Sequence, residues 1–332
     1  MDNFSKSEKE MYDLRKQKIS FLNELTSNSF PTKFNESVKV ADVIKEHSEI
    51  KDGEHTGVNV SIRGRILNAR SFGKLLFYDL LDQSGKIQLL INSGEIDELY
   101  LKLFDNFDIG DIIAVNGEII KTKKGELSIK VNETTILSKS LRTLPEKWHG
   151  LKDKETRFRQ RYLDLIVNPE SKRILQTRSN VVRLLREYLH ATEFIEVETP
   201  ILQSKAGGAI AKPFQTHHNA LNLDMYLRIA PELYLKRLVI GGFEKVFEIG
   251  KIFRNEGIDQ THQPEFTMLE SYQAYADMNI VMDMVEDMCN YVFDNLEIDK
   301  KLEFNGEEAS FSGPWKRVSM YDLVSEKFGI KI

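Results

Sequence analysis

Hydrophobic residues recur with two different periods along this chain, and the change of period separates its parts. Residues 5–25 carry apolar side chains at helical spacing between charges, which predicts an exposed amphipathic helix. Pro31 disfavours helix in the residue before it, so the helix is expected to end before residues 30–34. The apolar positions of this helix are Met11, Leu14, Ile19, Leu22 and Leu25.

From about residue 56 the period becomes two, which is typical of strands. Turn residues separate the alternating segments at 71–73, 83–85 and 123–125, and residues 96–107 look helical. Five short strands of this kind predict a small closed barrel. An OB-fold is the natural candidate, although other small barrels fit the pattern nearly as well. The alternating positions are Val58, Val60, Ile62, Ile66, Ile87, Leu89, Ile91, Ile113, Val115, Leu127, Ile129 and Val131.

The second half of the chain has a different pattern. After a charged, proline-containing linker at 141–161, residues 171–191 have helical spacing, and Pro200 interrupts a strand at 194–202. Helices, hairpins and antiparallel strands then alternate without repeating β-α-β units or a Gly-rich phosphate loop, which excludes P-loop and Rossmann solutions. We therefore predict an α+β protein. Its expected parts are residues 1–45 (helix and lead-in), 46–142 (barrel), 143–170 (linker) and 171–332 (antiparallel-sheet domain).

Composition narrows the class of protein. The 332 residues, 41% of them hydrophobic, are enough for two domains with cores. The single cysteine, Cys289, excludes a disulfide scaffold and suits a reducing cytosol. Neither a membrane-length apolar run nor a signal-peptide core is present, so a soluble cytoplasmic protein is expected. The net charge of -5 does not exclude nucleic acid, and the basic clusters at 121–124 and 157–161 taken alone indicate solvated surface.

The stretch 247–270 (FEIGKIFRNEGIDQTHQPEFTMLE) predicts two antiparallel strands joined by a loop. It combines the cation of Arg254 with the aromatic ring of Phe266 and the carboxylate of Glu270. A guanidinium can hold a carboxylate and a phosphate together, and it can stabilise the charge that develops when that carboxylate attacks phosphorus. No general base is needed, because the nucleophile is already an anion.

This stretch resembles motif 2 of the class II aminoacyl-tRNA synthetases, in the form found in the lysyl-tRNA synthetases. Residues 171–191 with 194–202 resemble motif 1, the dimer-interface element, which implies a homodimer with Pro200 at its interface. The loop QSKAGGAIAKPFQTHHN (203–219) and the segment YLRIAPELYLKRL (226–238) favour lysyl over aspartyl or asparaginyl relatives. The resemblance implies an OB-fold followed by an incomplete class II catalytic domain that holds motifs 1 and 2 only.

The resemblance also implies roles for motif 2 in binding ATP. Arg254 would be the catalytic residue and would hold the α-phosphate and the lysine carboxylate. Glu256 would accept a hydrogen bond from the adenine amino group, and His262 would approach the terminal phosphates. Phe266 would stack on the adenine.

For lysine, the resemblance assigns the α-amino group to the carbonyl of Gly208 and the carboxylate of Glu232. Glu232 also suits the first turn of a helix after Pro231. Glu270 and Tyr272 would line the pocket, with Tyr272 near the ε-ammonium end. Three departures from the family pattern are Lys212 in place of the usual Arg, and Ser271 and Gln273 beside Tyr272. His217 and His218 are expected to be structural rather than zinc ligands.

In the barrel, Phe77 and Gln88 are expected on neighbouring strands, where an aromatic ring beside an amide suits an unpaired base. The related class IIb enzymes hold the central anticodon base with such a pair and a Glu on a later strand, which we place at Glu126. The implied partner is tRNA(Lys). The implied reaction is lysine plus ATP to lysyl-adenylate, followed by transfer to the tRNA.

Nothing in residues 297–332 resembles motif 3 or the two acidic Mg²⁺ ligands that precede it. We therefore expect a fragment whose metal ligands lie beyond Ile332 and which is inactive alone in lysine-dependent ATP–pyrophosphate exchange. Two alternatives stay open. One is a noncatalytic tRNA-binding module, and the other is a paralogue that lysylates another acceptor.

Overall fold

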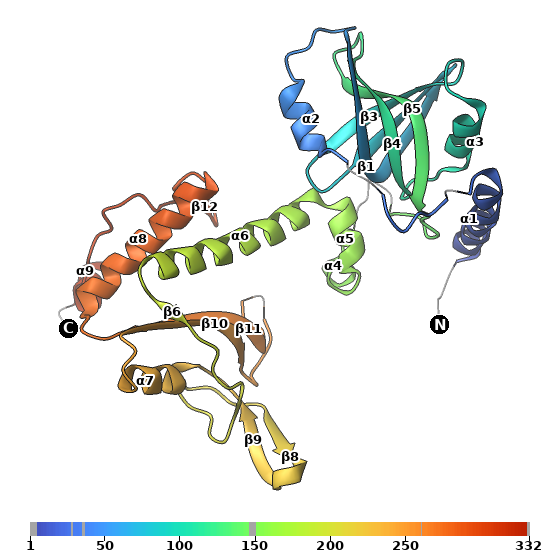
Figure 1. Cartoon of the computed structure of the whole chain (residues 1–332). Coiled ribbons are helices and arrows are strands. Elements are labelled where there is room, and N and C mark those ends of the chain that lie inside the picture. The colour runs from blue at the N-terminus through green and yellow to red at the C-terminus, as the bar shows by residue number, and fades with distance from the viewer. Residues whose placement is uncertain (1–4, 28, 35–36, 146–150, 260, 331–332) are drawn as a thin grey trace. The chain divides into compact units, whose positions relative to one another are not determined.

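The computed structural model describes residues 5–27, 29–34, 37–145, 151–259 and 261–330. The chain forms two units, residues 1–169 and 170–332 (Figure 1). In the described part, no helix is long and apolar enough to cross a membrane.

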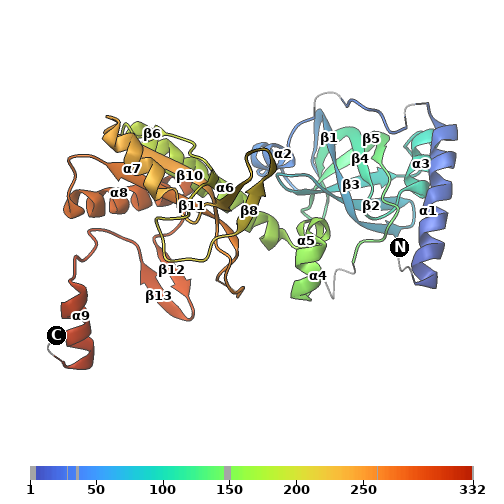
Figure 2. The same cartoon turned by 90° about the horizontal axis from the view of Figure 1, so that it is seen from below.

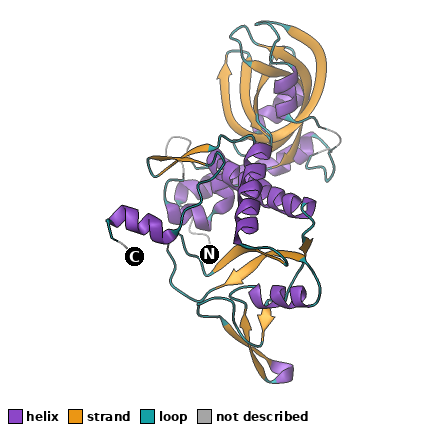
Figure 3. Cartoon of the chain, turned by 90° about the vertical axis from the view of Figure 1, so that its left-hand side faces the viewer, coloured by secondary structure: helices purple, strands orange, loops and turns teal. Residues whose placement is uncertain are grey.

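Five strands of the first unit close into a barrel with the order β1-β2-β3-β5-β4. The curved strands of the barrel are drawn in orange in Figure 3. A register shift between Ile66 and Asn68 bends the long first strand, so that it pairs with both β2 and β4. The barrel confirms the small closed fold expected from the alternation. The strands are β1 (His55–Phe72), β2 (Leu75–Leu81), β3 (Lys86–Asn92), β4 (Ile112–Lys121) and β5 (Leu127–Ser138).

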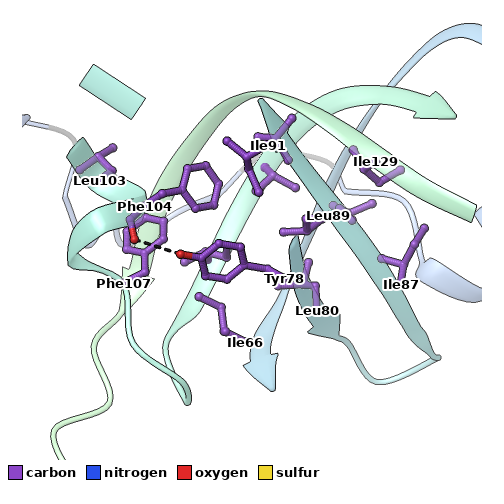
Figure 4. Packing of buried hydrophobic residues seen from close by; sticks show 14 of the residues in the cluster. Ile66, Tyr78, Leu80, Ile87, Leu89, Ile91, Leu103, Phe104, Phe107 and Ile129 are labelled. Atoms are coloured by element: carbon purple, nitrogen blue, oxygen red, sulfur yellow. Dashed lines mark hydrogen bonds between the residues drawn. The ribbon is translucent and has the colours of Figure 1, made fainter. Parts of the chain in front are cut away.

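The inward-facing residues of the strands form the barrel core, as Figure 4 shows. Helix α3 (Glu98–Asn106) adds Phe104, whose carbonyl accepts a hydrogen bond from the Tyr78 hydroxyl at 3.2 Å. Burial raises the pKa of Tyr78 to about 12. Val58 was expected on the buried face but is 44% exposed, because the register of β1 shifts between His55 and Asn59.

Two further helices of this unit precede the barrel, α1 (Lys6–Leu25) and α2 (Val40–Glu46). Helix α1 confirms the predicted amphipathic helix and buries Leu22 completely. Charges also anchor it, because Arg15 donates from Nη1 to the carbonyls of Ser140 (2.8 Å) and Arg142 (3.1 Å). Lys18 pairs with Asp108 at 2.8 Å.

The residues expected to be a linker contain two short helices, α4 (Lys154–Arg159) and α5 (Arg161–Val167). Asp153 caps the first by accepting from the backbone N–H of Thr156 at 2.7 Å. The buried carboxylate of Asp164 holds Arg157 and Arg161, which joins the two helices. Residues 146–150 of the expected linker lie outside the described residues.

The second unit is built on a sheet with the order β11-β10-β6, formed by β6 (Ile195–Glu196), β10 (Lys245–Phe253) and β11 (Glu265–Gln273). Helices α6 (Pro169–Ala191) and α8 (Met278–Leu296) cover one face, and α7 (Glu232–Ile240) lies on the other (Figure 1); Figure 2 shows the unit from the α7 side. Strand β6 runs parallel to β10, unlike the expected antiparallel pairing. The long connection between the two strands permits this direction.

The expected strand at 194–202 is two short strands in different sheets, and Pro200 lies between them. The second of these strands, β7, belongs to a small sheet of order β7-β9-β8. The remaining elements are β7 (Leu202–Gln203), β8 (Gln215–His218), the 3-10 helix η1 (Asn219–Leu221), β9 (Leu223–Leu227), the hairpin β12 (Lys301–Phe304) and β13 (Glu307–Ser310), and α9 (Met320–Phe328).

Candidate functional site

The pairing of β10 with β11 gives the central sheet one apolar face and one polar face. Opposite partners in an antiparallel pair share a face, and Glu248 lies opposite Glu270, as Val246 lies opposite Tyr272. The other face carries Phe247 and packs against α6 and α8. The prediction that Glu270 and Tyr272 share one face is therefore confirmed.

Arg254 directly follows β10 at the end of this polar face. Its backbone N–H donates to the carbonyl of Pro264 at 2.9 Å, which closes the two strands beyond their last pair. The guanidinium lies 5.2 Å from the centre of the Phe266 ring, within the range of a cation–π contact. A fixed cation and a half-buried aromatic ring thus lie together, as the sequence predicted for the two strands.

Glu232 and Gly208 meet on the α7 side of the sheet. Pro231 occupies the position before the helix and Glu232 is its first residue, which agrees with the predicted helix start. Gly208 has a φ of +87°, and a Cβ there would lie 2.8 Å from the Cβ of Glu232 and 3.4 Å from its Oε2. Only glycine fits this position without strain, so the loop backbone approaches the Glu232 carboxylate closely.

Glu270 is a half-buried residue, one of whose carboxylate oxygens lacks a partner. Its Oε2 atom is buried without a hydrogen bond to any described residue. Burial raises the pKa of Glu270, the charge of Glu232 raises it further, and Arg254 opposes the change. Burial together with Glu270 raises the pKa of Tyr272 to about 12. A cation placed between these groups would offset the free-energy cost of burying the ionised carboxylate of Glu270.

Sequence reasoning missed a buried ion pair beside Glu270. Arg228 is 2% exposed and bonds to Glu248, which is 4% exposed. Arg228 also donates from Nε to the carbonyl of Lys251 at 2.9 Å and from Nη1 to the Thr199 hydroxyl at 3.1 Å. The available signal was a charged residue in the middle of each of two otherwise apolar segments, 226–230 and 246–250.

Glu256 and His262 lie in the exposed loop between β10 and β11. Glu256 accepts from the backbone N–H of Lys212 at 3.3 Å, which ties this loop to the Gly208 loop. His262 is bound to Asp259, with 2.8 Å between its Nδ1 and Oδ2, and its side chain is 74% exposed. The backbone N–H of Thr261 and the His262 ring hold the pKa of Asp259 well below its usual range. The predicted role of His262 at the terminal phosphates therefore stays a prediction.

The other predicted positions differ in their surroundings. Pro200 is exposed. His217 pairs with Asp224 across the β8–β9 hairpin at 2.8 Å, and His218 accepts from the backbone N–H of Leu221. Among the described residues there is no group of three or more metal-ligating side chains.

Phe77, Gln88 and Glu126 all line one surface cavity of the barrel, with a volume of ≈ 910 Å³. Phe77 and Gln88 lie on the neighbouring strands β2 and β3, as predicted, and Glu126 directly precedes β5 rather than lying on it. The cavity is also basic, since Arg70 and residues 121, 123 and 124 line it. The cluster at 121–124, which alone indicated solvated surface, therefore borders this candidate nucleic-acid site.

The amide of Gln88 has a fixed orientation in this cavity. Its Nε2 donates to the Ser128 hydroxyl at 2.8 Å, and its Oε1 accepts from Arg70 at 3.5 Å. Arg70 is itself paired with Asp79 at 3.2 Å. One N–H and one lone pair of the amide stay available, which is the pattern needed to read the edge of a base.

Two parts of the chain match families of known proteins. Residues 153–331 match the family model described as tRNA synthetases class II (D, K and N), and residues 60–137 match the model of an OB-fold nucleic acid binding domain. The chain is 48% identical over 333 residues to a lysine--tRNA ligase of Clostridium botulinum, covering 99% of this chain and 65% of that protein. It is 49% identical over 328 residues to the lysine--tRNA ligase of Clostridium perfringens, covering 98% and 64% respectively.

The chain thus spans about two thirds of the length of these relatives, 65% in the first comparison. The family model covers more than half of the chain, including β10, β11 and the loop between them. An OB-fold of the nucleic-acid-binding type precedes that region. On these grounds the chain belongs to the class II tRNA synthetase family of the D, K and N type, and it is a homologue of the lysine--tRNA ligases.

Proposed function

We propose that this chain carries the lysine- and ATP-binding residues of a lysine--tRNA ligase, together with the barrel that binds the anticodon of tRNA(Lys). The reaction would join L-lysine to AMP and then transfer the lysyl group to the tRNA. The proposal is supported by the similarity to two ligases of that name. The protein would be cytoplasmic and would act as a homodimer with Pro200 at the interface.

The observation that carries the proposal is the Oε2 atom of Glu270, which is buried without a hydrogen bond in the described part of the chain. A buried carboxylate of this kind needs a cationic partner. The ε-ammonium of lysine would supply it, with the Tyr272 hydroxyl beside it. The α-amino group would bind Glu232 and the carbonyl of Gly208, whose close approach leaves Glu232 Oε2 facing the loop.

In the proposed activation step, a carboxylate oxygen of lysine attacks the α-phosphorus of ATP. The bond from that phosphorus to the bridging oxygen breaks, and pyrophosphate leaves with the electron pair. Arg254 would hold the lysine carboxylate and the α-phosphate and stabilise the developing charge. Phe266 would stack on the adenine, Glu256 would accept from its amino group, and His262 would contact the terminal phosphates. No described residue is assigned to Mg²⁺, which commonly accompanies ATP.

In the barrel, Phe77 would stack on the central anticodon base, Gln88 would read its edge and Glu126 would bind beside it. Support comes from the shared cavity of ≈ 910 Å³ and from the fixed amide of Gln88. The lysines at 121, 123 and 124 would contact phosphates, so binding should weaken with salt.

The test is calorimetric titration of the purified chain with a stable sulfamoyl analogue of lysyl-adenylate, and separately with an anticodon stem-loop of tRNA(Lys). We expect binding of both, loss of analogue binding in Glu270→Gln, and no binding of the aspartyl analogue. Stem-loop binding without analogue binding would favour a noncatalytic tRNA-binding module. Analogue binding without anticodon-dependent RNA binding would favour a paralogue with another acceptor.

A further inference from the structure

Glu232 divides its two carboxylate oxygens between different neighbours. Oε1 accepts from the ammonium of Lys236, one helical turn further along α7, at 2.5 Å. Oε2 faces Gly208, since a Cβ on that glycine would lie 3.4 Å from it. The carboxylate therefore has one oxygen fixed by the chain and the other directed at the loop.

Lys236 is also in contact with the other end of the proposed lysine site. Its Nζ lies 5.9 Å from the centre of the Tyr272 ring on β11. An ordinary exposed Glu–Lys pair on a helix contributes little to stability. Here the lysine contacts two residues from different elements, both of which face the same site.

We infer that Lys236 is a positioning residue for the amino-acid site: it holds Glu232 in the orientation that receives the α-amino group of the ligand. This inference rests on the lysine site of the proposed function. It names a residue that does not touch the ligand but decides how well the chain recognises an α-amino group.

Two effects of Lys236 oppose each other. Its charge repels a cationic ligand, whereas its hydrogen bond orients the carboxylate. The Lys236 side chain is 53% exposed, so water screens the repulsion strongly. The hydrogen bond acts at short range and is little affected by screening. Orientation should therefore dominate, and removing Lys236 should weaken binding rather than strengthen it.

The experiment compares two ligands, L-lysine and 6-aminohexanoate, which is lysine without its α-amino group. Their dissociation constants are measured by calorimetry for the full chain and for the variants Lys236→Met, Lys236→Arg and Lys251→Met. Lys251 is the matched control, because its side chain is 52% exposed and pairs with Glu265 at 2.9 Å. A folding defect would affect both ligands, whereas loss of positioning affects L-lysine alone.

We expect Lys236→Met to weaken L-lysine binding about tenfold, because Glu232 would lose the orientation in which it makes a charge-assisted hydrogen bond to the α-amino group, and to leave 6-aminohexanoate unchanged. Lys236→Arg should restore most of the loss, and Lys251→Met should change neither ligand. Equal or tighter binding of L-lysine by Lys236→Met overturns the inference and leaves the proposed site standing. Failure of the unaltered chain to bind L-lysine defeats the proposed site, and the inference with it.

Discussion

Glu248 and Glu270 lie opposite each other on β10 and β11, but their carboxylates have different partners. Arg228 bonds to Glu248 inside the unit, while Glu270 Oε2 is buried without a hydrogen bond to the described residues. One carboxylate is thus satisfied within the fold, whereas one oxygen of its neighbour has no hydrogen-bond partner among the described residues.

Replacing Arg228 by Met should destabilise the second unit by about 3–5 kcal/mol, because Glu248 would stay buried without its cation. Hydrogen–deuterium exchange of β10 amides measures this directly and should accelerate by about a hundredfold or more. Arg183→Met, which breaks an exposed pair with Glu187, is the control and should change little. The double change Arg228→Met with Glu248→Leu should recover much of the protection. Unaltered exchange in Arg228→Met would show that the ion pair does not stabilise the sheet.

The raised pKa of Glu270 predicts how lysine binding depends on pH. A cationic ligand binds the ionised carboxylate, so affinity should fall as pH falls through this raised pKa, above the ordinary value of 4.5. The same shift means that the folded chain holds this proton more tightly than the unfolded chain. Ionisation of Glu270 therefore lowers stability as pH rises through the same range. Titrations with L-lysine from about pH 5 to about pH 8 test the first effect. A profile in the unaltered chain as flat as that of Glu270→Gln would contradict it.

Gly208→Ala should abolish binding of the lysyl-adenylate analogue. The new Cβ would lie 2.8 Å from the Cβ of Glu232, and the φ of +87° adds strain of roughly 1–2 kcal/mol. Gly242→Ala separates the two causes, since Gly242 has a φ of +105° but no atom within 4 Å of a new Cβ. The Gly242→Ala variant should lose a similar amount of stability but should still bind the lysyl-adenylate analogue. Loss of the analogue in both variants would point to strain alone.

Phe77→Ala should weaken binding of the anticodon stem-loop by about 1–3 kcal/mol, the usual worth of one stacked base. Filter binding at fixed salt measures the change. Phe304→Ala is the control, because Phe304 is 72% exposed on the β12–β13 hairpin. An effect of the same size in both variants would assign the loss to something other than stacking in the barrel.

Sequence patterns predicted the features of the fold that depend on local order. Alternation gave the barrel strands, and the Pro231–Glu232 pair gave the start of α7. The two antiparallel strands around Arg254 followed from their apolar period and the polar loop between them. Of the adjacent glycines Gly207 and Gly208, only Gly208 adopts a positive φ, a difference that depends on its tertiary surroundings.

The unpredicted features depend on contacts between distant residues. The parallel pairing of β6 with β10 joins residues about fifty positions apart, and no local pattern encodes its direction. Arg228 and Glu248 look like ordinary charged residues until the sheet brings them together. The same is true of Lys139 and Asp111, buried partners at 2.6 Å in the barrel unit. Burial of a charge is decided by its partner, which a linear pattern does not show.

The strand order of the barrel also bears on the order in which a growing chain can fold. Strand β5 lies between β3 and β4, so the barrel cannot close until residues 127–138 have been synthesised. Arg15 of α1 bonds to the carbonyl of Ser140, which lies 125 residues later in the chain. The helix that leaves the ribosome early is therefore among the last elements to be fixed. Helix α3 is available to pack against α1 before that point, but the Arg15 contacts that anchor α1 cannot form until residues 140–142 have been synthesised.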